Sequence, residues 1–163
     1  MKKTAIFFAT LGIFLLASPV LAEDTVAIRS PKPRLEQAKA RVCEAKKGSI
    51  TKRVDQLLAR SEKMVKNFTD IAQRVMDYYT NKVLPDKTVS NYEELVAAIT
   101  DKKAVVDAAL DDAKSKASTF SCDSESPKAQ LTEYRLAMQK VISALKEYRT
   151  AVRNLIVAVK SEK

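Results

Sequence analysis

The stretch LTEYRLAMQKVISALKEYRTAVRNLIVAV, residues 131–159, decides the fold. Its apolar residues recur at alternating steps of three and four: Leu131, Tyr134, Met138, Val141, Leu145, Tyr148, Val152, Leu155 and Val159. This spacing places them along one face of an α-helix, and that face must pack against a partner. Four of these residues, Met138, Leu145, Val152 and Val159, are each directly preceded by an alanine, and such small side chains let a second helix approach closely: Ala137, Ala144, Ala151 and Ala158. The stretch therefore predicts a packing surface for other helices rather than a cofactor site.

A second long helix is predicted from about Arg34 to Lys82. Its apolar stripe repeats at Ile50, Val54, Leu57, Ser61, Met64, Phe68, Ile71, Val75 and Tyr78, and is widened by Leu58, Val65, Ala72 and Tyr79. A stripe of this width is typical of a helix in a bundle, although it can equally serve a dimer. Before Gly48 the apolar positions leave this frame by about one residue, so we expect a continuous helix with a frame shift rather than a break.

A third helix is expected between these two, over residues 90–118. Val83 to Val89 contains Pro85 and predicts the first connection, because proline interrupts helical periodicity. Ser90, followed three positions later by Glu93, predicts a capping box at the start of this helix.

The last helix, residues 127–161, is predicted to begin at Ser126-Pro127, with the serine as N-cap and the proline in the first turn. No stretch of the chain has the period of a β-strand. The fold class is therefore all-α, an elongated antiparallel three-helix bundle that is coiled-coil-like and runs up, down and up.

Cys43 and Cys122 are the chain's two cysteines. If short connections make neighbouring helices antiparallel, the lengths of the predicted helices bring the two cysteines close together. An even pair in an exported protein is most simply a disulfide. A redox role is disfavoured because a catalytic pair would normally have the C-x-x-C spacing.

Residues 1–22 have the pattern of a signal peptide. Lys2 and Lys3 precede an apolar run, and the small residue Ala22 ends a cleavage pattern. We therefore expect export to the periplasm, cell envelope or extracellular space, with cleavage near Ala22; the alternative is an uncleaved membrane anchor. Residues 23–33 are expected to form a non-helical arm, because prolines disfavour helix in the residues before them. Residues 34–163 would then form the bundle.

Positive charge is concentrated at one end of the predicted bundle. The formal net charge is +9, and the segment 29–53 holds nine basic and two acidic residues. The candidate contacts for an anionic partner are Arg34, Lys39, Arg41, Lys46, Lys47, Lys52 and Arg53. The alternative is an ordinary solvated helix end. Nucleic acid is disfavoured as a partner, because no aromatic residues are interleaved with these basic ones.

Three tyrosines gather at the other end of the predicted bundle. Tyr78, Tyr79 and Tyr92 flank the first connection and are candidate contacts for a partner at that tip. The alternative is that they close the end of the bundle.

Catalytic and metal sites are not indicated by the sequence. Histidine is absent and glycine occurs twice, so the commonest general base, the commonest zinc ligand and Gly-rich phosphate loops are excluded. Asp107 and Asp111 could share a helix face, but a solvated face explains them better than a cation site. We therefore predict a non-enzymatic protein without cofactor that acts by binding an unknown protein or an anionic envelope component. The alternatives are a periplasmic holdase-like chaperone, a protein that binds anionic membrane surfaces peripherally, and a homo-oligomer.

Overall fold

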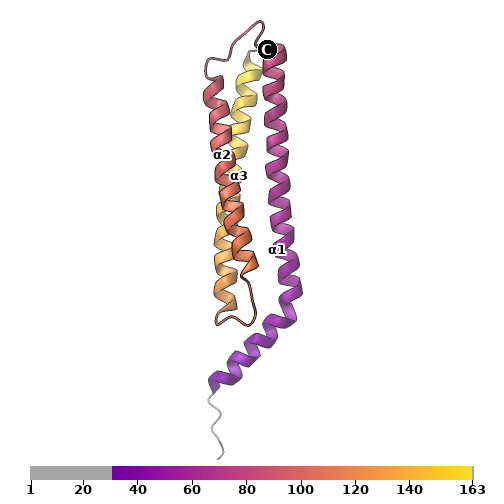
Figure 1. The fold of residues 1–163 in the computed structure, drawn as a ribbon, viewed down its shortest axis with the longest axis vertical. Helices are drawn as coiled ribbons and strands as arrows, with labels where there is room; N and C mark the ends of the chain where they lie inside the picture. The colour runs from indigo at the N-terminus through magenta and orange to yellow at the C-terminus, as the bar shows by residue number, and fades with distance from the viewer. Residues whose placement is uncertain (1–30, 163) are drawn as a thin grey trace, which may run out of the picture.

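The computed structural model describes residues 31–162, which form three long helices packed together (Figure 1). These are α1 (Pro31–Tyr78), α2 (Tyr92–Ser118) and α3 (Pro127–Ser161). In Figure 1, α1 and α3 run upwards, and α2, which follows α1 and precedes α3 in the sequence, runs downwards. No strand occurs within the described range. The prediction of an all-helical fold with three packed helices is confirmed.

The core follows the face predicted for α3. Eight of its nine apolar positions are buried, and Leu131 at the start is half-buried. Three of the four alanines beside this face are also buried, which lets α2 approach closely. Ile99, Val106 and Leu110 of α2 pack into the same core. The uninterrupted period of α3 therefore sets the position of the other two helices.

The wide stripe predicted on α1 is divided by the structure. Ser61, Val65, Ala72 and Tyr79 are buried. Another row of the stripe stays 38–40% exposed: Leu57, Met64, Ile71 and Tyr78. Each of its members directly precedes a residue of the row Leu58, Val65, Ala72 and Tyr79. The prediction that both rows face the core was wrong for this second row. Two neighbouring helices contact only part of so wide a stripe, and its outer edge is left in solvent.

Helix α1 is continuous through Gly48, as the sequence predicted. It begins at Pro31, three residues earlier than expected, and so includes the end of the predicted arm. Proline is tolerated in the first turn of a helix because amides there have no partner within the helix. Figure 1 shows that the N-terminal part of α1 is inclined and projects past the loop between α2 and α3. The predicted signal peptide and residues 23–30 of the arm lie outside the described residues.

The ends of the helices differ from the predicted caps. α1 passes into a π-helical turn, η1 (Tyr79–Val83), in which the Leu84 amide donates to the Tyr79 carbonyl at 2.9 Å. The predicted capping box at Ser90 is wrong: α2 starts later, after Asn91, and no side chain caps it. Glu93 and Glu94 instead place negative charge at the positive end of the helix dipole.

The start of α3 is placed correctly at Ser126-Pro127, but the serine hydroxyl makes no capping bond. Its backbone carbonyl accepts hydrogen bonds from the amides of Ala129 and Gln130 instead.

Candidate functional site

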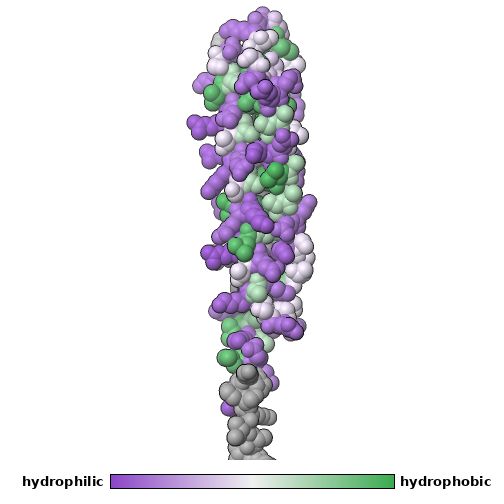
Figure 2. Space-filling model, turned by 90° about the vertical axis from the view of Figure 1, so that its left-hand side faces the viewer, coloured by the Kyte–Doolittle hydropathy of each residue, from purple (hydrophilic) through white to green (hydrophobic). Residues whose placement is uncertain are grey.

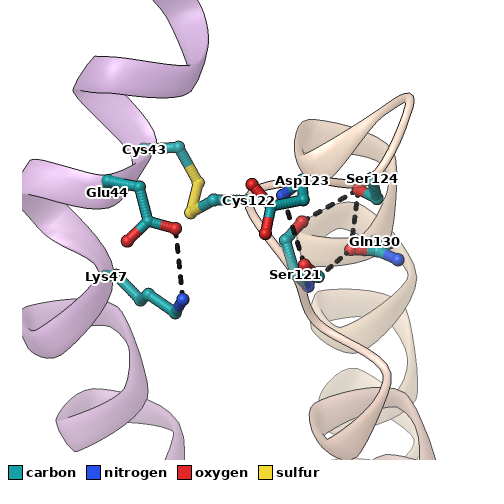
Figure 3. The surroundings of a disulfide bond; sticks show 8 residues. All are labelled: Cys43, Glu44, Lys47, Ser121, Cys122, Asp123, Ser124 and Gln130. Carbon is teal, nitrogen blue, oxygen red and sulfur yellow. Dashed lines mark hydrogen bonds and ion pairs between the residues drawn. A yellow bond between two sulfur atoms is a disulfide. The ribbon is translucent and has the colours of Figure 1, made fainter.

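The end of the bundle at which α1 overhangs is held by the predicted disulfide. Cys43 of α1 is bonded to Cys122 in the loop between α2 and α3, with a Cα–Cα distance of 5.6 Å (Figure 3). The loop is fixed to α3 in turn: the Ser121 amide and the Ser124 hydroxyl both donate to Oε1 of Gln130, at 3.0 and 3.1 Å. The disulfide therefore joins α1 to a loop that is already anchored on α3.

An open apolar cleft of about 440 Å³ lies beside the disulfide. Its lining comes from α1 and from the start of α3: Ala38, Lys39, Val42, Cys43, Lys46, Ile50, Pro127, Lys128 and Leu131. The uncharged part of this lining is apolar apart from the disulfide sulfur, and its only charged residues are three lysines. Such a cleft can hold an apolar group and place an attached anion beside lysine ammonium groups.

The seven basic residues selected from the sequence all lie on the exposed surface of α1. Lys39 and Lys46 line the cleft, whereas the other five do not. Lys39 forms an ion pair with Glu36 at 2.8 Å, and Lys47 forms one with Glu44 at 3.1 Å. The structure adds Lys128, which sequence reasoning missed. Its nearness to α1 depends on the disulfide and on the path of the loop rather than on any local pattern.

The three tyrosines at the opposite end have different environments. Tyr79 is buried and stacks on Tyr92, with ring centroids 3.8 Å apart. Burial, and then the nearby Glu93 carboxylate, raise the pKa of Tyr92. Tyr79 and Tyr92 therefore close the bundle end. Tyr78 instead lines a smaller cleft of about 290 Å³ with Arg74 and Val75 of α1 and Ile156, Val159 and Lys160 of α3.

Three of the eight ion pairs between described residues join α2 to a neighbouring helix, and the other five lie within one helix. Lys114 of α2 lies 2.8 Å from Glu62 of α1, and this hydrogen bond raises the pKa of Lys114. On the α3 side, Lys102 pairs with Glu147 and Lys116 pairs with Glu133.

Asp107 and Asp111, for which the sequence favours a solvated face over a cation site, both lie near lysines. The hydrogen bond from Lys103 to Asp107, 2.6 Å long, raises the pKa of Lys103, and Asp111 lies 3.9 Å from Lys114. Within residues 31–162, no group of three or more His, Cys, Asp or Glu side chains could hold a metal ion.

Comparison of the chain with protein-family models, with curated proteins and with solved structures found no match. In the part of the chain that the structure describes, no helix is both long and apolar enough to cross a membrane. Function is therefore inferred from the clefts and charges described above.

Proposed function

We propose that the protein is an exported, non-enzymatic binding protein, and that the cleft beside the disulfide binds an anionic partner outside the cytoplasm. The signal-peptide pattern of residues 1–22 supports export, and a disulfide is compatible with an oxidising compartment.

The observation that carries this proposal is the combination of apolar lining and lysine rim in one cleft. Burial of the apolar lining by a ligand contributes favourably to the binding free energy, and the lysines attract and orient the negative charge of the ligand. Of the three lysines, Lys39 alone has a carboxylate within ion-pair distance, and that pair is exposed. Among residues 31–162, Lys46 and Lys128 have no ion-pair partner, so their charges are available to a ligand.

A direct test uses poly-L-glutamate as the acidic probe and the oxidised protein obtained by export of the full chain. Replacing the three rim lysines together (Lys39→Gln, Lys46→Gln, Lys128→Gln) should weaken binding about tenfold, because each exposed charge contributes on the order of 0.5 kcal/mol. Raised salt should weaken the wild-type complex as well.

The matched control removes the same number of charges elsewhere, as Lys63→Gln, Lys140→Gln and Lys146→Gln. These lysines are exposed and lie outside the cleft. This control should bind nearly as the wild type does. Equal losses in the two triple variants would show that net charge alone attracts the probe and would overturn the cleft as the site.

A second candidate function is peripheral binding to an anionic membrane surface. It is favoured by Leu35 and Val42, which are 56% and 57% exposed on the projecting part of α1 beside basic residues. Flotation with vesicles of a zwitterionic lipid, with and without an anionic lipid, separates the two functions. A membrane binder would float only with the anionic vesicles and would lose this on Leu35→Ser, at an exposed residue outside the lining of the cleft.

A further inference from the structure

The two clefts described above both lie between α1 and α3, one near each end of the bundle. Four lining residues of the cleft beside the disulfide have a counterpart in the other cleft 28 residues, or four heptads, further along the same helix: Lys46 and Arg74, Ile50 and Tyr78, Lys128 and Ile156, and Leu131 and Val159. Residues seven apart lie on the same face of a packed helix. Equivalent positions therefore recur along the α1–α3 seam over about 42 Å, at 1.5 Å per residue. We call the two clefts, together with the heptad rows between them, the α1–α3 groove.

Along this α1–α3 groove, α1 contributes two heptad rows. The apolar row is Ile50, Leu57, Met64, Ile71 and Tyr78, and the row beside it is Lys46, Arg53, Arg60, Asn67 and Arg74. Four members of the apolar row are 38–40% exposed. They are thus recessed along the seam but uncovered.

Helix α3 contributes a row in which basic and apolar residues alternate: Lys128, Arg135, Ile142, Arg149 and Ile156. Ile142 and Ile156 are 49% and 36% exposed. None of the three rows contains an acidic residue.

The charges of this groove are not neutralised within the molecule. Within the described range, no arginine forms an ion pair, and no ion pair joins α1 to α3. The other two seams differ, because Glu62, Glu133 and Glu147 bridge them to lysines of α2. Figure 2 shows the left-hand side of Figure 1, to which α2 and the beginning of α3 both contribute, and there hydrophilic side chains dominate and hydrophobic ones are scattered.

We propose that the α1–α3 groove receives an amphipathic α-helix of an acidic partner protein, as the fourth helix of a bundle. The helix would carry apolar residues in heptads, to cover the apolar rows, and Asp or Glu on both flanks, to pair with the arginines. This inference rests on the proposed function, since it names the class of the anionic partner and extends its contact surface from the disulfide end to Tyr78.

Charge and shape favour this occupant over the alternatives. A second copy docked through the same groove would place arginines against arginines, which costs free energy. A flat membrane would not follow recessed residues spaced in heptads between two helix edges, whereas a helix fits that spacing.

The probe for this groove is a synthetic peptide of about four heptads, with leucine at the core positions and glutamate on the flanks. A permuted peptide of identical composition, without helical periodicity, is the control. The oxidised protein should bind the ordered peptide at least tenfold more tightly, by fluorescence anisotropy, and the bound peptide should gain helical circular dichroism.

Matched variants locate the complex. Arg60→Glu with Arg149→Glu reverses two charges in the middle of the groove and should weaken peptide binding at least tenfold. Lys63→Glu with Lys140→Glu makes the same charge change outside it. Lys63 precedes by one heptad Asp70, which lines a cleft facing α2, and Lys140 precedes by one heptad Glu147, which pairs with α2. This control pair should leave the affinity within about threefold.

The outcomes separate this inference from the function on which it rests. Binding of poly-L-glutamate without preference for the ordered peptide would overturn the helix-binding groove and leave the basic cleft standing. Absence of binding to either acidic probe would overturn both. If light scattering shows a dimer and the variant Arg60→Glu with Arg149→Glu strengthens it, the groove binds a second copy instead of a partner helix. If the protein floats with anionic vesicles, shows no preference for the ordered peptide, and loses flotation in the same variant, the groove binds a membrane.

Discussion

Tyr148 shows how single residues fix α3 against α1. Its side chain is fully buried, its hydroxyl lies 3.0 Å from the Thr69 hydroxyl, and its ring meets Phe68 edge-on at 5.9 Å. The Thr69 hydroxyl donates its hydrogen to the Val65 carbonyl, at 2.9 Å, so Tyr148 is the donor in the pair. The buried hydroxyl of Tyr148 on α3 is thus satisfied by a hydrogen bond to Thr69 of α1.

Tyr148→Phe tests this contact at the residue scale. The substitution keeps the ring packing and removes one buried hydrogen bond, so the free energy of unfolding should fall by about 1 kcal/mol. Urea unfolding followed by circular dichroism measures it. Tyr78→Phe, at an exposed position, is the control and should change stability by less than about 0.5 kcal/mol. An equal effect of the two substitutions would contradict the role given to Tyr148.

Stability in alkali is a second prediction at this scale. Burial, and then the Asp55 carboxylate, raise the pKa of Tyr134, whose hydroxyl donates to the Val54 carbonyl at 3.3 Å. The folded state therefore keeps this proton at pH values where the unfolded chain, with the ordinary pKa of 10.0, releases it. The contribution is complete below pH 10.0 and is lost as the pH rises through the folded pKa.

Urea midpoints measured at several pH values on either side of this range provide the test. The wild type should lose stability above it, and Tyr134→Phe should lose less over the same interval, because the variant has no phenol to titrate there. A steeper loss in the variant than in the wild type would contradict the shift of the Tyr134 pKa.

At the scale of the element, Gly48 is a weak point inside α1. It lies in the continuous helix, and a Cβ added there would meet nothing within 4 Å. Gly48→Ala should therefore stabilise the protein by about 0.5–1 kcal/mol, because alanine loses less backbone entropy on folding. Ala45→Gly, on the same exposed part of α1, should destabilise by a similar amount. The measurement is urea unfolding, and a loss of stability in Gly48→Ala would contradict an unstrained helix at this position.

The disulfide acts on two elements at once. Its removal in Cys43→Ser with Cys122→Ser opens a covalent loop with a sequence separation of 79, and the chain-entropy model gives a cost of about 4 kcal/mol. Urea unfolding of this variant should match that of the fully reduced wild type. The oxidised wild type should show no thiol that reacts with a thiol reagent. A loss below about 1 kcal/mol would contradict the disulfide as a main constraint on the unfolded chain.

Elements differ in how far the sequence predicts them. The buried face of α3 is predicted correctly because an apolar residue recurs at every third or fourth position without exception. Only one face of a helix has this spacing. The apolar stripe on α1 is too wide to identify one buried row, so the sequence does not decide whether Val65 or Met64 faces the core. The predicted cap of α2 is wrong because Ser90 lies inside a turn, which the hydrogen bond from the Tyr92 amide to the Val89 carbonyl closes at 3.2 Å, and the helix begins after Asn91.

At the scale of the whole molecule, the candidate site was predictable only in part. Composition points to a basic end, and Lys39 and Lys46 do lie in a cleft there. The opposing wall, with Lys128 and Leu131, depends on the fold and has no local signature. The sequence does hold a pattern that points to this surface. Four of five positions in one heptad row of α1 and three of five in one row of α3 are basic, and apolar residues repeat beside them with the same step.

The molecule as a whole is asymmetric in charge. Carboxylates bridge α2 to both of its neighbours. The arginines of the α1–α3 groove form no ion pair with any described residue, and they lie beside exposed apolar rows. Repulsion between two such grooves predicts a monomer in solution at physiological salt, measured by light scattering coupled to size exclusion. A stable dimer that survives high salt would contradict this prediction.

Isoleucine methyl resonances of the oxidised protein, followed while the ordered acidic peptide is added, test the central claim most directly. Ile71, Ile142 and Ile156 are exposed members of the rows of the α1–α3 groove, whereas Ile99 belongs to α2, is buried in the core and serves as the internal reference. The three groove methyls should shift together with saturation, and Ile99 should stay unchanged. Shifts confined to Ile99, or an unchanged spectrum at saturating peptide, would contradict a helix-binding groove between α1 and α3.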